Sequence, residues 1–253
     1  MTLKYKIDLP LDAPERTLVH KEIILSKPFL KNLYIEWYGT FVDEFNKLPP
    51  GKVVELGSGG GFLKELLPTI ISSDILHLPS NDMTFSALNM PFDDGSISGL
   101  FMVDTFHHLP DASSFLSEAN RVLEENGKLI MIEPANSLWG RFIYSHFHHE
   151  PFNPDGNWQI SDSGPLTGAN GALPWIVFVR DKAIFNKVFP KLEIEEITFH
   201  SPLRYLLSGG VSFKQIVPDI SFPFFRGIDN FLVSLSKELS MFMTIKIRKV
   251  NNG

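Results

Sequence analysis

Short apolar runs alternate along the chain with stretches in which apolar positions recur at helical spacing. Residues 12–48 show the helical spacing, and Pro28 divides them into two predicted helices because proline interrupts helical hydrogen bonding. Pro49-Pro50-Gly51 predicts the end of this helical part. A short buried strand is then predicted in KVVEL, and further strands in TIISSDI, within DMTFSALNM, in SISGLFMVD and in KLIMIEP.

The order of these elements predicts an α/β fold. Strands that are apolar throughout are typical of a mostly parallel sheet with helices on both faces. ASSFLSEANRVLEEN predicts an amphipathic helix that Gly127 caps before the fifth strand. RDKAIFNKVFPKL predicts another helix, EIEEITF a strand, and MFMTIKIRKV a last strand that pairs as in a hairpin.

Two segments interrupt this alternation, at 135–178 and 201–240. Long insertions in a compact fold are usually functional or mobile, so we expect both on the substrate side. The predicted organisation is one domain over 1–253, with a helical cap in 1–50 and the core of the fold in 51–134.

Composition narrows the class of protein. Hydrophobic residues make up 43% and charged residues 21%, with no apolar run long enough to span a membrane and no secretory signal core. Cysteine is absent, which excludes disulfides and thiol chemistry, so we expect a cytoplasmic protein. The net charge of −6 argues against nucleic acid as a partner.

The glycine run VVELGSGGG, at residues 53–61, is the strongest chemical signal. Phe62-Leu63 follow the last glycine, where a Walker A loop needs Lys and Ser or Thr. Counted from Gly57, Phe62 also occupies the position of the last glycine of a dinucleotide fingerprint. The pattern that fits is acid-x-G-x-G-x-G, formed by Glu55, Gly57, Gly59 and Gly61.

This loop and three later segments resemble the class I S-adenosylmethionine-dependent methyltransferases, in particular the type 11, UbiE-like enzymes that act on small molecules. Asp74 follows the second strand, as the family's ribose-binding acid does. ALNMPFDDGSISGLFMVDTFHHLPD and FLSEANRVLEENGKLIMIEP are similar to the family's third-to-fourth-strand and fifth-strand regions. The resemblance implies a Rossmann-like seven-stranded, mostly parallel sheet with an antiparallel last strand and an N-terminal helical cap.

The resemblance also implies a site for S-adenosyl-L-methionine. Glu55 would hold the methionyl end, Asp74 the ribose, and Ala87-Leu88-Asn89 the adenine edge, with Ile75 and Met90 on the adenine faces. The glycines let the backbone approach a ligand, and the following helix would favour its carboxylate. The expected cofactor-binding residues are Glu55, Gly57, Ser58, Gly59, Gly61, Asp74, Ile75, Ala87, Leu88, Asn89, Asp104, Thr105 and His107.

The sequence departs from the family pattern at two places near the adenine site. Ser86 stands where the family usually has an aspartate. The segment between Asp74 and Asp82 is short and contains Pro79, so we expect at most one helical turn between the second and third strands.

Several histidines could act in catalysis. His107-His108 could supply a general base or shape the cofactor pocket, and Glu133 could face the substrate or hydrogen-bond in the core. If HFHHE is helical, His146, His149 and Glu150 share one face as metal ligands would; otherwise a histidine there is an acid–base residue on a lid, or the segment is a polar surface loop. We take His108 and His149 as catalytic candidates and predict no metal site.

The composition of the C-terminal tail is compatible with more than one kind of partner. Residues 201–253 carry seven Lys and Arg against three Asp and Glu, together with six phenylalanines. Peripheral membrane contact through 201–240, a cover over the substrate or a dimer interface would each explain this composition. GPLTGANGALPW, at 164–175, would suit a lid that excludes water.

The predicted function is methyl transfer from S-adenosylmethionine to a small-molecule, glycan or lipid-linked acceptor. Two alternatives stay open. A cofactor-binding pseudo-enzyme or binding module would keep the pocket without methyl transfer. A nicotinamide oxidoreductase would require a dinucleotide fingerprint, whose last glycine is missing here.

Overall fold

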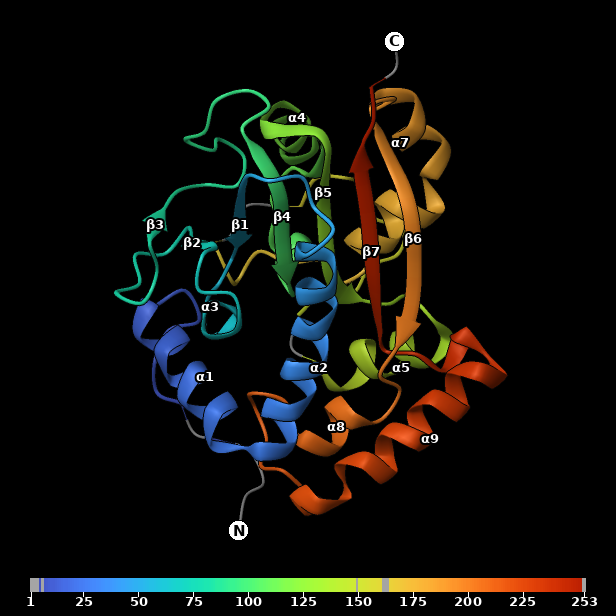
Figure 1. The fold of residues 1–253 in the computed structure, drawn as a ribbon. Coiled ribbons are helices and arrows are strands. Elements are labelled where there is room, and N and C mark those ends of the chain that lie inside the picture. The colour runs from blue at the N-terminus through green and yellow to red at the C-terminus, as the bar shows by residue number, and fades with distance from the viewer. Residues whose placement is uncertain (1–4, 6, 149, 161–163, 252–253) are drawn as a thin grey trace.

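The computed structural model describes residues 5, 7–148, 150–160 and 164–251. A seven-stranded sheet forms its centre, in the order β3-β2-β1-β4-β5-β7-β6 (Figure 1). All neighbouring strands pair in parallel except β7, which is antiparallel to both β5 and β6. The strands are β1 (Lys52–Leu56), β2 (Ile71–Asp74), β3 (Met83–Thr84), β4 (Ile97–Val103), β5 (Leu123–Pro134), β6 (Leu192–His200) and β7 (Phe242–Lys249). The predicted sheet and its antiparallel last strand are confirmed.

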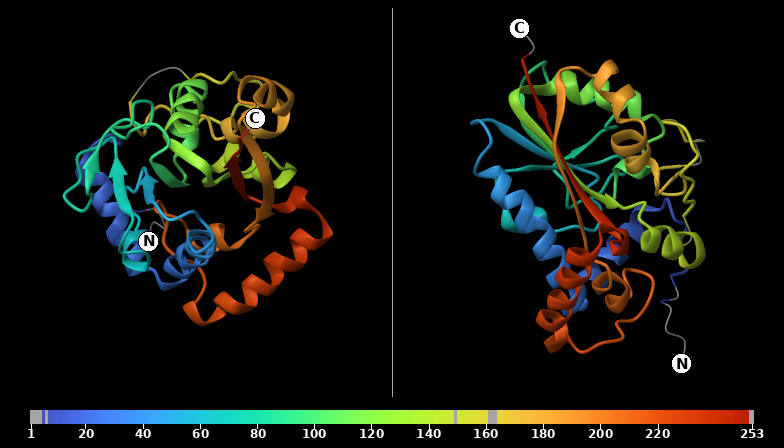
Figure 2. Two further views of the ribbon diagram at one scale, coloured as in Figure 1. Left: turned by 45° about the horizontal axis from the view of Figure 1, so that its top comes forward. Right: turned by 90° about the vertical axis from the view of Figure 1, so that its right-hand side faces the viewer.

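Helices cover both faces of the sheet, as the apolar strands require (Figure 2). On one face Phe41 of α2 (Pro28–Phe45) stacks on Phe101 of β4, with ring centroids 4.8 Å apart. On the other face Phe115 of α4 (Ala112–Val122) and Phe185 of α7 (Lys182–Val188) are fully buried in a second apolar cluster. The N-terminal cap is present as α1 (Pro14–Ser26) and α2, which are separated at Pro28 as predicted.

One predicted cap is wrong. Gly127 does not end α4, because the helix stops at Val122 and β5 begins with Leu123, which pairs with Ile97. Gly127 lies inside the strand, where a Cβ would come within 3.1 Å of the Ile97 carbonyl oxygen. The glycine is required by close approach to β4, and the adjacent Asn126 adopts the left-handed conformation with φ +63°.

The segments outside the sheet contain more helix than their composition indicates. Residues 135–178 include α5 (Leu138–Phe147), α6 (Leu173–Trp175) and most of the π-helical turn η2 (Ile176–Arg180). Residues 201–240 form α8 (Arg204–Ser208), the turn η3 (Asp219–Ser221), α9 (Phe222–Leu235) and the turn η4 (Lys237–Leu239). No helix of the described residues is long and apolar enough to cross a membrane.

A buried arginine ties the 201–240 segment to the cap. Arg204 is 1% exposed; its Nε donates to Asp229 of α9 at 2.7 Å, and its two terminal nitrogens donate to Glu36 of α2, each at 2.7 Å. The Phe222 ring lies 5.1 Å from the guanidinium carbon. Because each charge has a partner, α8 is held against α2 and α9, which places the adjacent Tyr205 over the carboxyl ends of the strands.

Candidate functional site

A cavity of about 450 Å³ lies at the carboxyl ends of β1, β2, β4 and β5. In Figure 1 the arrowheads of β1 and β4 point toward the side on which α1 and α8 lie. This edge is where open α/β sheets bind ligands. The volume of the cavity is within the range of small-ligand pockets.

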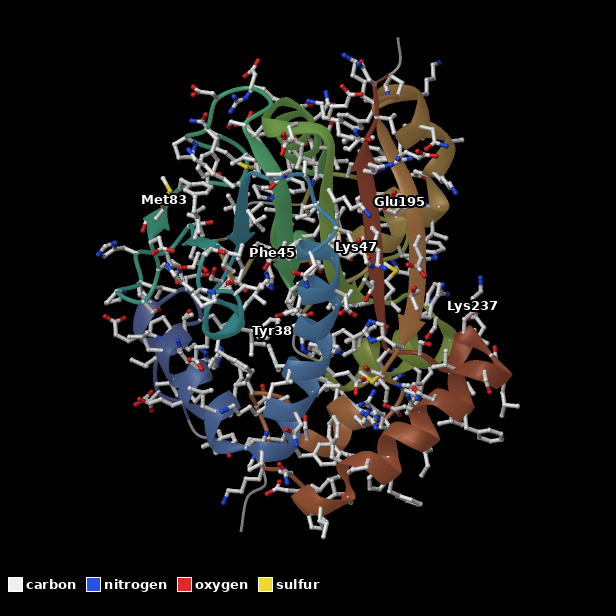
Figure 3. All side chains as sticks on the ribbon, in the orientation of Figure 1. Tyr38, Phe45, Lys47, Met83, Glu195 and Lys237 are labelled. Atoms are coloured by element: carbon white, nitrogen blue, oxygen red, sulfur yellow. The ribbon has the colours of Figure 1, made fainter. Side chains whose placement is uncertain are left out.

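The glycine loop forms one wall of the cavity. Gly57 has φ +66° and Gly59 has φ +44°, a region that side chains rarely adopt. A Cβ on Gly57 would lie 2.4 Å from Thr105 Oγ1, and a Cβ on Gly61 would lie 2.5 Å from the hydroxyl oxygen of Tyr38, labelled in Figure 3. The loop is therefore glycine-rich because its backbone is pressed against β4 and α2 as well as facing the cavity.

Only one helical turn, α3 (Leu63–Leu66), follows the loop. A helix does begin behind the loop, as expected, but it is too short to favour a carboxylate strongly. So few aligned peptide units give only a weak dipole.

Two buried acids flank the loop. Glu55, on β1, is 4% exposed, and burial raises the pKa of its carboxyl to about 7 against the opposing effects of Ser58 and the Lys21 ammonium. Asp74, at the end of β2, accepts hydrogen bonds from Gly59 N at 3.0 Å and Leu76 N at 2.8 Å. Burial raises the pKa of Asp74, against these backbone amides. Both carboxyls line the cavity, and both residues are buried.

The segment after β2 forms the next wall. Ile75, Ala87 and Leu88 line the cavity, and Ile75 is 54% exposed. Asn89 is exposed and lies outside the lining that the described residues form; its backbone amide donates to the Ser86 carbonyl at 2.9 Å. Met90, expected on an adenine face, is 2% exposed and packs in the apolar core. No helix is present among residues 75–82, as the short connection predicts.

The ends of β4 and β5 carry a buried charge network. Glu133 is fully buried; its Oε1 accepts from Thr105 N at 2.9 Å and Phe106 N at 2.7 Å, and its Oε2 accepts from His107 Nδ1 at 2.7 Å. Of the two predicted alternatives for Glu133, facing the substrate or hydrogen-bonding in the core, the structure shows the second. Asp104 has φ +48°, and burial, with Glu133, raises the pKa of its carboxyl to about 7 while His107 lowers it.

Glu150 closes this network from the segment after α5. Its carboxylate lies 3.3 Å from His107 Nε2 and 3.7 Å from His108 Nε2, and 3.5 Å from His148 Nδ1. Burial would lower the pKa of His107, but Glu133 and Glu150 together hold it well above its usual range. Burial and the charge on His107 lower the pKa of His108 to about 4, so His108 is neutral while its Nδ1 donates to the Gly168 carbonyl at 2.9 Å.

Residues 54–131 match the family model of a methyltransferase domain, which spans the glycine loop, Asp74 and β4. This part of the chain is therefore similar to a methyltransferase domain. Comparison with the curated proteins gives no match.

Two solved structures share the fold of this chain. The geranyl diphosphate C-methyltransferase of Streptomyces coelicolor A3(2), in complex with Mg²⁺, geranyl diphosphate and S-adenosyl-L-homocysteine, is 14% identical, with a TM-score of 0.54 over 95% of this chain and 86% of that one. A complex of the Haloferax volcanii Trm112 methyltransferase activator with a methyltransferase is also 14% identical, with a TM-score of 0.54 over 97% of this chain and 100% of that one. At these identities the likeness establishes the fold.

The predicted site residues converge on one cavity. All the expected cofactor-binding residues line it except Asn89, and His108 lines it as well. His146, by contrast, is exposed on α5 and its Nδ1 bonds the Phe142 carbonyl at 2.8 Å, while Glu150 pairs with other histidines. The predicted ligand face of His146, His149 and Glu150 is therefore not formed as one helical face, since α5 ends at Phe147. His149 lies outside the described residues.

Sequence reasoning missed the opposite wall of the cavity. It is aromatic, and its residues come from α2, α5, the segment after α5, α8 and β7: Tyr34, Tyr38, Tyr144, Phe152, Tyr205 and Phe242. Tyr144 donates to the Met241 carbonyl at 2.8 Å and stacks on Phe152, with centroids 5.2 Å apart. No local motif marks these residues, because each appears in the sequence as an ordinary core aromatic.

The cavity is covered by contacts between the N-terminal segment and the 164–168 loop. Asp12 accepts from Leu166 N at 2.7 Å, from Thr167 N at 3.0 Å and from Thr167 Oγ1 at 2.8 Å. Leu166 and Gly168 line the cavity beneath this contact. The 164–168 loop therefore occupies the position expected of a lid.

The tail presents an apolar surface. Ile220, Phe224, Phe231 and Leu235 are each more than 60% exposed on η3 and α9, next to the exposed Arg226. Phe222 and Asp229 face inward. An amphipathic helix of this kind is what the expected membrane contact requires, and that contact stays a prediction.

Proposed function

We propose that the protein transfers the methyl group of S-adenosylmethionine to a small organic acceptor that binds inside the cavity beside the cofactor. The observation that carries the proposal is that one covered cavity joins two chemically different halves. We name the first half, lined by the glycine loop, Glu55, Asp74 and the 75–88 wall, the cofactor half. We name the second, lined by the aromatic wall and the histidines, the acceptor half.

The cofactor half fits S-adenosylmethionine by its donor and acceptor groups. Glu55 is a buried carboxyl whose raised pKa would fall if a cationic amine were placed beside it, as the methionyl end would do. Asp74 can accept from a ribose diol, and Ile75 with Leu88 offers apolar contact to a flat base. When bound, the cofactor supplies a methyl group already activated by the positive sulfur. The chain's own residues then mainly align the acceptor and exclude water.

The acceptor half supports a small acceptor rather than a polymer. The lid contacts of Asp12 with the 164–168 loop cover the cavity, so a long chain would have to displace them. Its aromatic wall favours an acceptor with an apolar or ring-containing body. His108 is the candidate base when no ion occupies the cluster around Glu150, because its Nδ1 is held by the Gly168 carbonyl and its Nε2 is directed into that cluster.

Calorimetry tests the cofactor assignment. We expect S-adenosylhomocysteine to bind, NAD to give no heat, and Asp74→Ala to weaken S-adenosylhomocysteine binding about tenfold or more, since a hydrogen bond to a charged group contributes about 1.5–3 kcal/mol. Asp94→Ala is the control, because Asp94 is an exposed acid that pairs with Arg121. Binding of NAD in place of S-adenosylhomocysteine, or equal affinity in both variants, would contradict the assignment.

A methyl-transfer assay tests the activity. Methyl-labelled cofactor is incubated with a panel of hydroxylated, amino and lipid-linked small molecules, and transfer to at least one class is expected. Cofactor binding without transfer to any of them would favour the pseudo-enzyme alternative.

A further inference from the structure

We propose that His107, His108 and Glu150 form a binding site for a divalent transition-metal ion of the zinc class, open toward the acceptor half of the cavity. The ion's use in catalysis rests on the proposed function; its binding does not. The site differs from the ligand set that the sequence suggested, because His146 is exposed and Glu150 turns toward the β4 end.

The three ligand atoms have the spacing that a small metal ion requires. Glu150 Oε2 lies 3.3 Å from His107 Nε2, and Glu150 Oε1 lies 3.7 Å from His108 Nε2. One ligand atom from each of the three residues lies within 4.8 Å of the other two. Bonds of about 2.0–2.1 Å in a tetrahedral zinc site put neighbouring ligand atoms about 3.4 Å apart. The two distances to Glu150 are therefore within a few tenths of an ångström of that spacing, and the third separation, between the two histidines, is at most 4.8 Å.

The outer hydrogen bonds of both histidines are those of metal ligands. His107 donates from Nδ1 to Glu133 at 2.7 Å, and His108 donates from Nδ1 to the Gly168 carbonyl at 2.9 Å. A metal-binding imidazole usually donates its second N–H to a carboxylate or a backbone carbonyl, which fixes the ring. Both Nε2 atoms are thereby directed at Glu150.

Glu133 orients a ligand and does not serve as one. Asp104, His107 and Glu133 also lie close enough to hold an ion. Both Glu133 oxygens, however, already accept hydrogen bonds, from Thr105 N and Phe106 N on one side and from His107 on the other. An ion there would have to break three short hydrogen bonds at a fully buried carboxyl, so the cluster around Glu150 is the favoured site.

The position of the cluster suits an oxygen-bearing acceptor. His107, His108 and Glu150 all line the cavity, so the remaining coordination position of a four-coordinate ion would face its interior. An ion with two imidazole ligands and one carboxylate binds hydroxyl or carboxylate oxygens and lowers the pKa of a bound hydroxyl. The acceptor class we infer is a small molecule with a hydroxyl group that can reach this ion.

Cobalt titration tests the site without any turnover. Chelator-treated protein is titrated with Co²⁺ alone while visible absorption is recorded, and Zn²⁺ competition is followed by calorimetry. We expect one equivalent of Co²⁺ to bind. His108→Ala and Glu150→Gln should each weaken binding at least tenfold, and His146→Ala, which removes an exposed histidine of α5, should leave it unchanged.

A fourth variant separates ligation from folding. Glu133→Gln keeps the side-chain shape but weakens the hydrogen bond that orients His107, so it should reduce Co²⁺ affinity while circular dichroism stays as in the wild type. The proposal is overturned if the wild type takes up no Co²⁺ at 1 mM, on the order of the weakest useful affinity. Equal binding in the wild type and in both ligand variants overturns it as well. Absence of S-adenosylhomocysteine binding in the same samples would instead contradict the proposed function.

Discussion

The two halves of the cavity are built in different ways. The cofactor half comes largely from one continuous stretch, residues 55–88, and much of its shape is backbone: two left-handed glycines and amide groups that bond Asp74. The acceptor half collects side chains from α2, α5, the segment after α5, α8 and β7, together with His107 and His108. A backbone-built site tolerates few substitutions, whereas a site assembled from side chains can change residue by residue.

The glycine loop offers the test with the largest expected effect. Gly57→Ala would place a Cβ 2.4 Å from the Thr105 side chain at φ +66°, so we expect a loss of about 3 kcal/mol in unfolding free energy, together with loss of S-adenosylhomocysteine binding. Chemical denaturation measures the first effect and calorimetry the second.

Gly95→Ala is the matched control for this prediction. Gly95 has φ +64°, but a Cβ there would meet no atom of the described residues within 4 Å. Its substitution therefore reports the backbone strain alone, of about 1 kcal/mol. If Gly57→Ala costs no more than Gly95→Ala, the close packing of the loop against Thr105 is not what shapes the cofactor half.

The buried Glu55 gives an effect on stability of similar size that depends on pH. Burial raises the pKa of this carboxyl from 4.5 to about 7 in the folded protein, so the folded state holds a proton that the unfolded state has released. Stability from this group is therefore present below about pH 4.5 and is lost as the pH rises to about 7, by about 3 kcal/mol. Glu55→Gln removes that loss, so the ligand-free variant should be more stable than the wild type at pH 8 and similar to it at pH 5.

Urea denaturation of both proteins from pH 4.5 to 8 measures this difference, and exposed Glu65→Gln serves as the control. If the unfolding free energies of the wild type and Glu55→Gln change with pH in the same way, the Glu55 carboxylate does not destabilise the folded protein. Weaker S-adenosylhomocysteine binding by the more stable variant would sharpen the comparison, because the acid would then be retained for the ligand.

The same contrast explains what the sequence could and could not predict. The place of Glu55, Gly57 and Asp74 beside one cavity could be predicted because it depends on spacing along one strand–loop–strand unit, which the chain itself records. The mostly parallel sheet with helices on both faces followed from the alternation of apolar runs and helices. Gly127 was misassigned because its close approach to Ile97 depends on strand pairing, which no local pattern shows.

The acceptor half could not be predicted in this way. Tyr144 and Tyr205 meet in the cavity although 61 positions separate their numbers, and each stands in an ordinary helical segment. Glu150 was noticed, but its partners were sought at helical spacing, whereas the chain leaves α5 at Phe147 and carries Glu150 back to His107. Such contacts are set by tertiary packing, which a single sequence does not display.

The lid offers the smallest effect and tests the acceptor half directly. Asp12→Ala removes three hydrogen bonds to Leu166 and Thr167 from a partly exposed carboxylate, so we expect a loss of about 1 kcal/mol, confined to the 164–168 loop. Amide hydrogen exchange at Leu166 and Thr167 should then be about fivefold faster, while S-adenosylhomocysteine affinity stays unchanged. Asp8→Ala, an exposed acid of the same segment, is the control. Asp12→Ala could instead weaken cofactor binding as much as Asp74→Ala does. The cofactor half and the acceptor half would then be coupled in binding, and the division between backbone-built and side-chain-built walls would not hold.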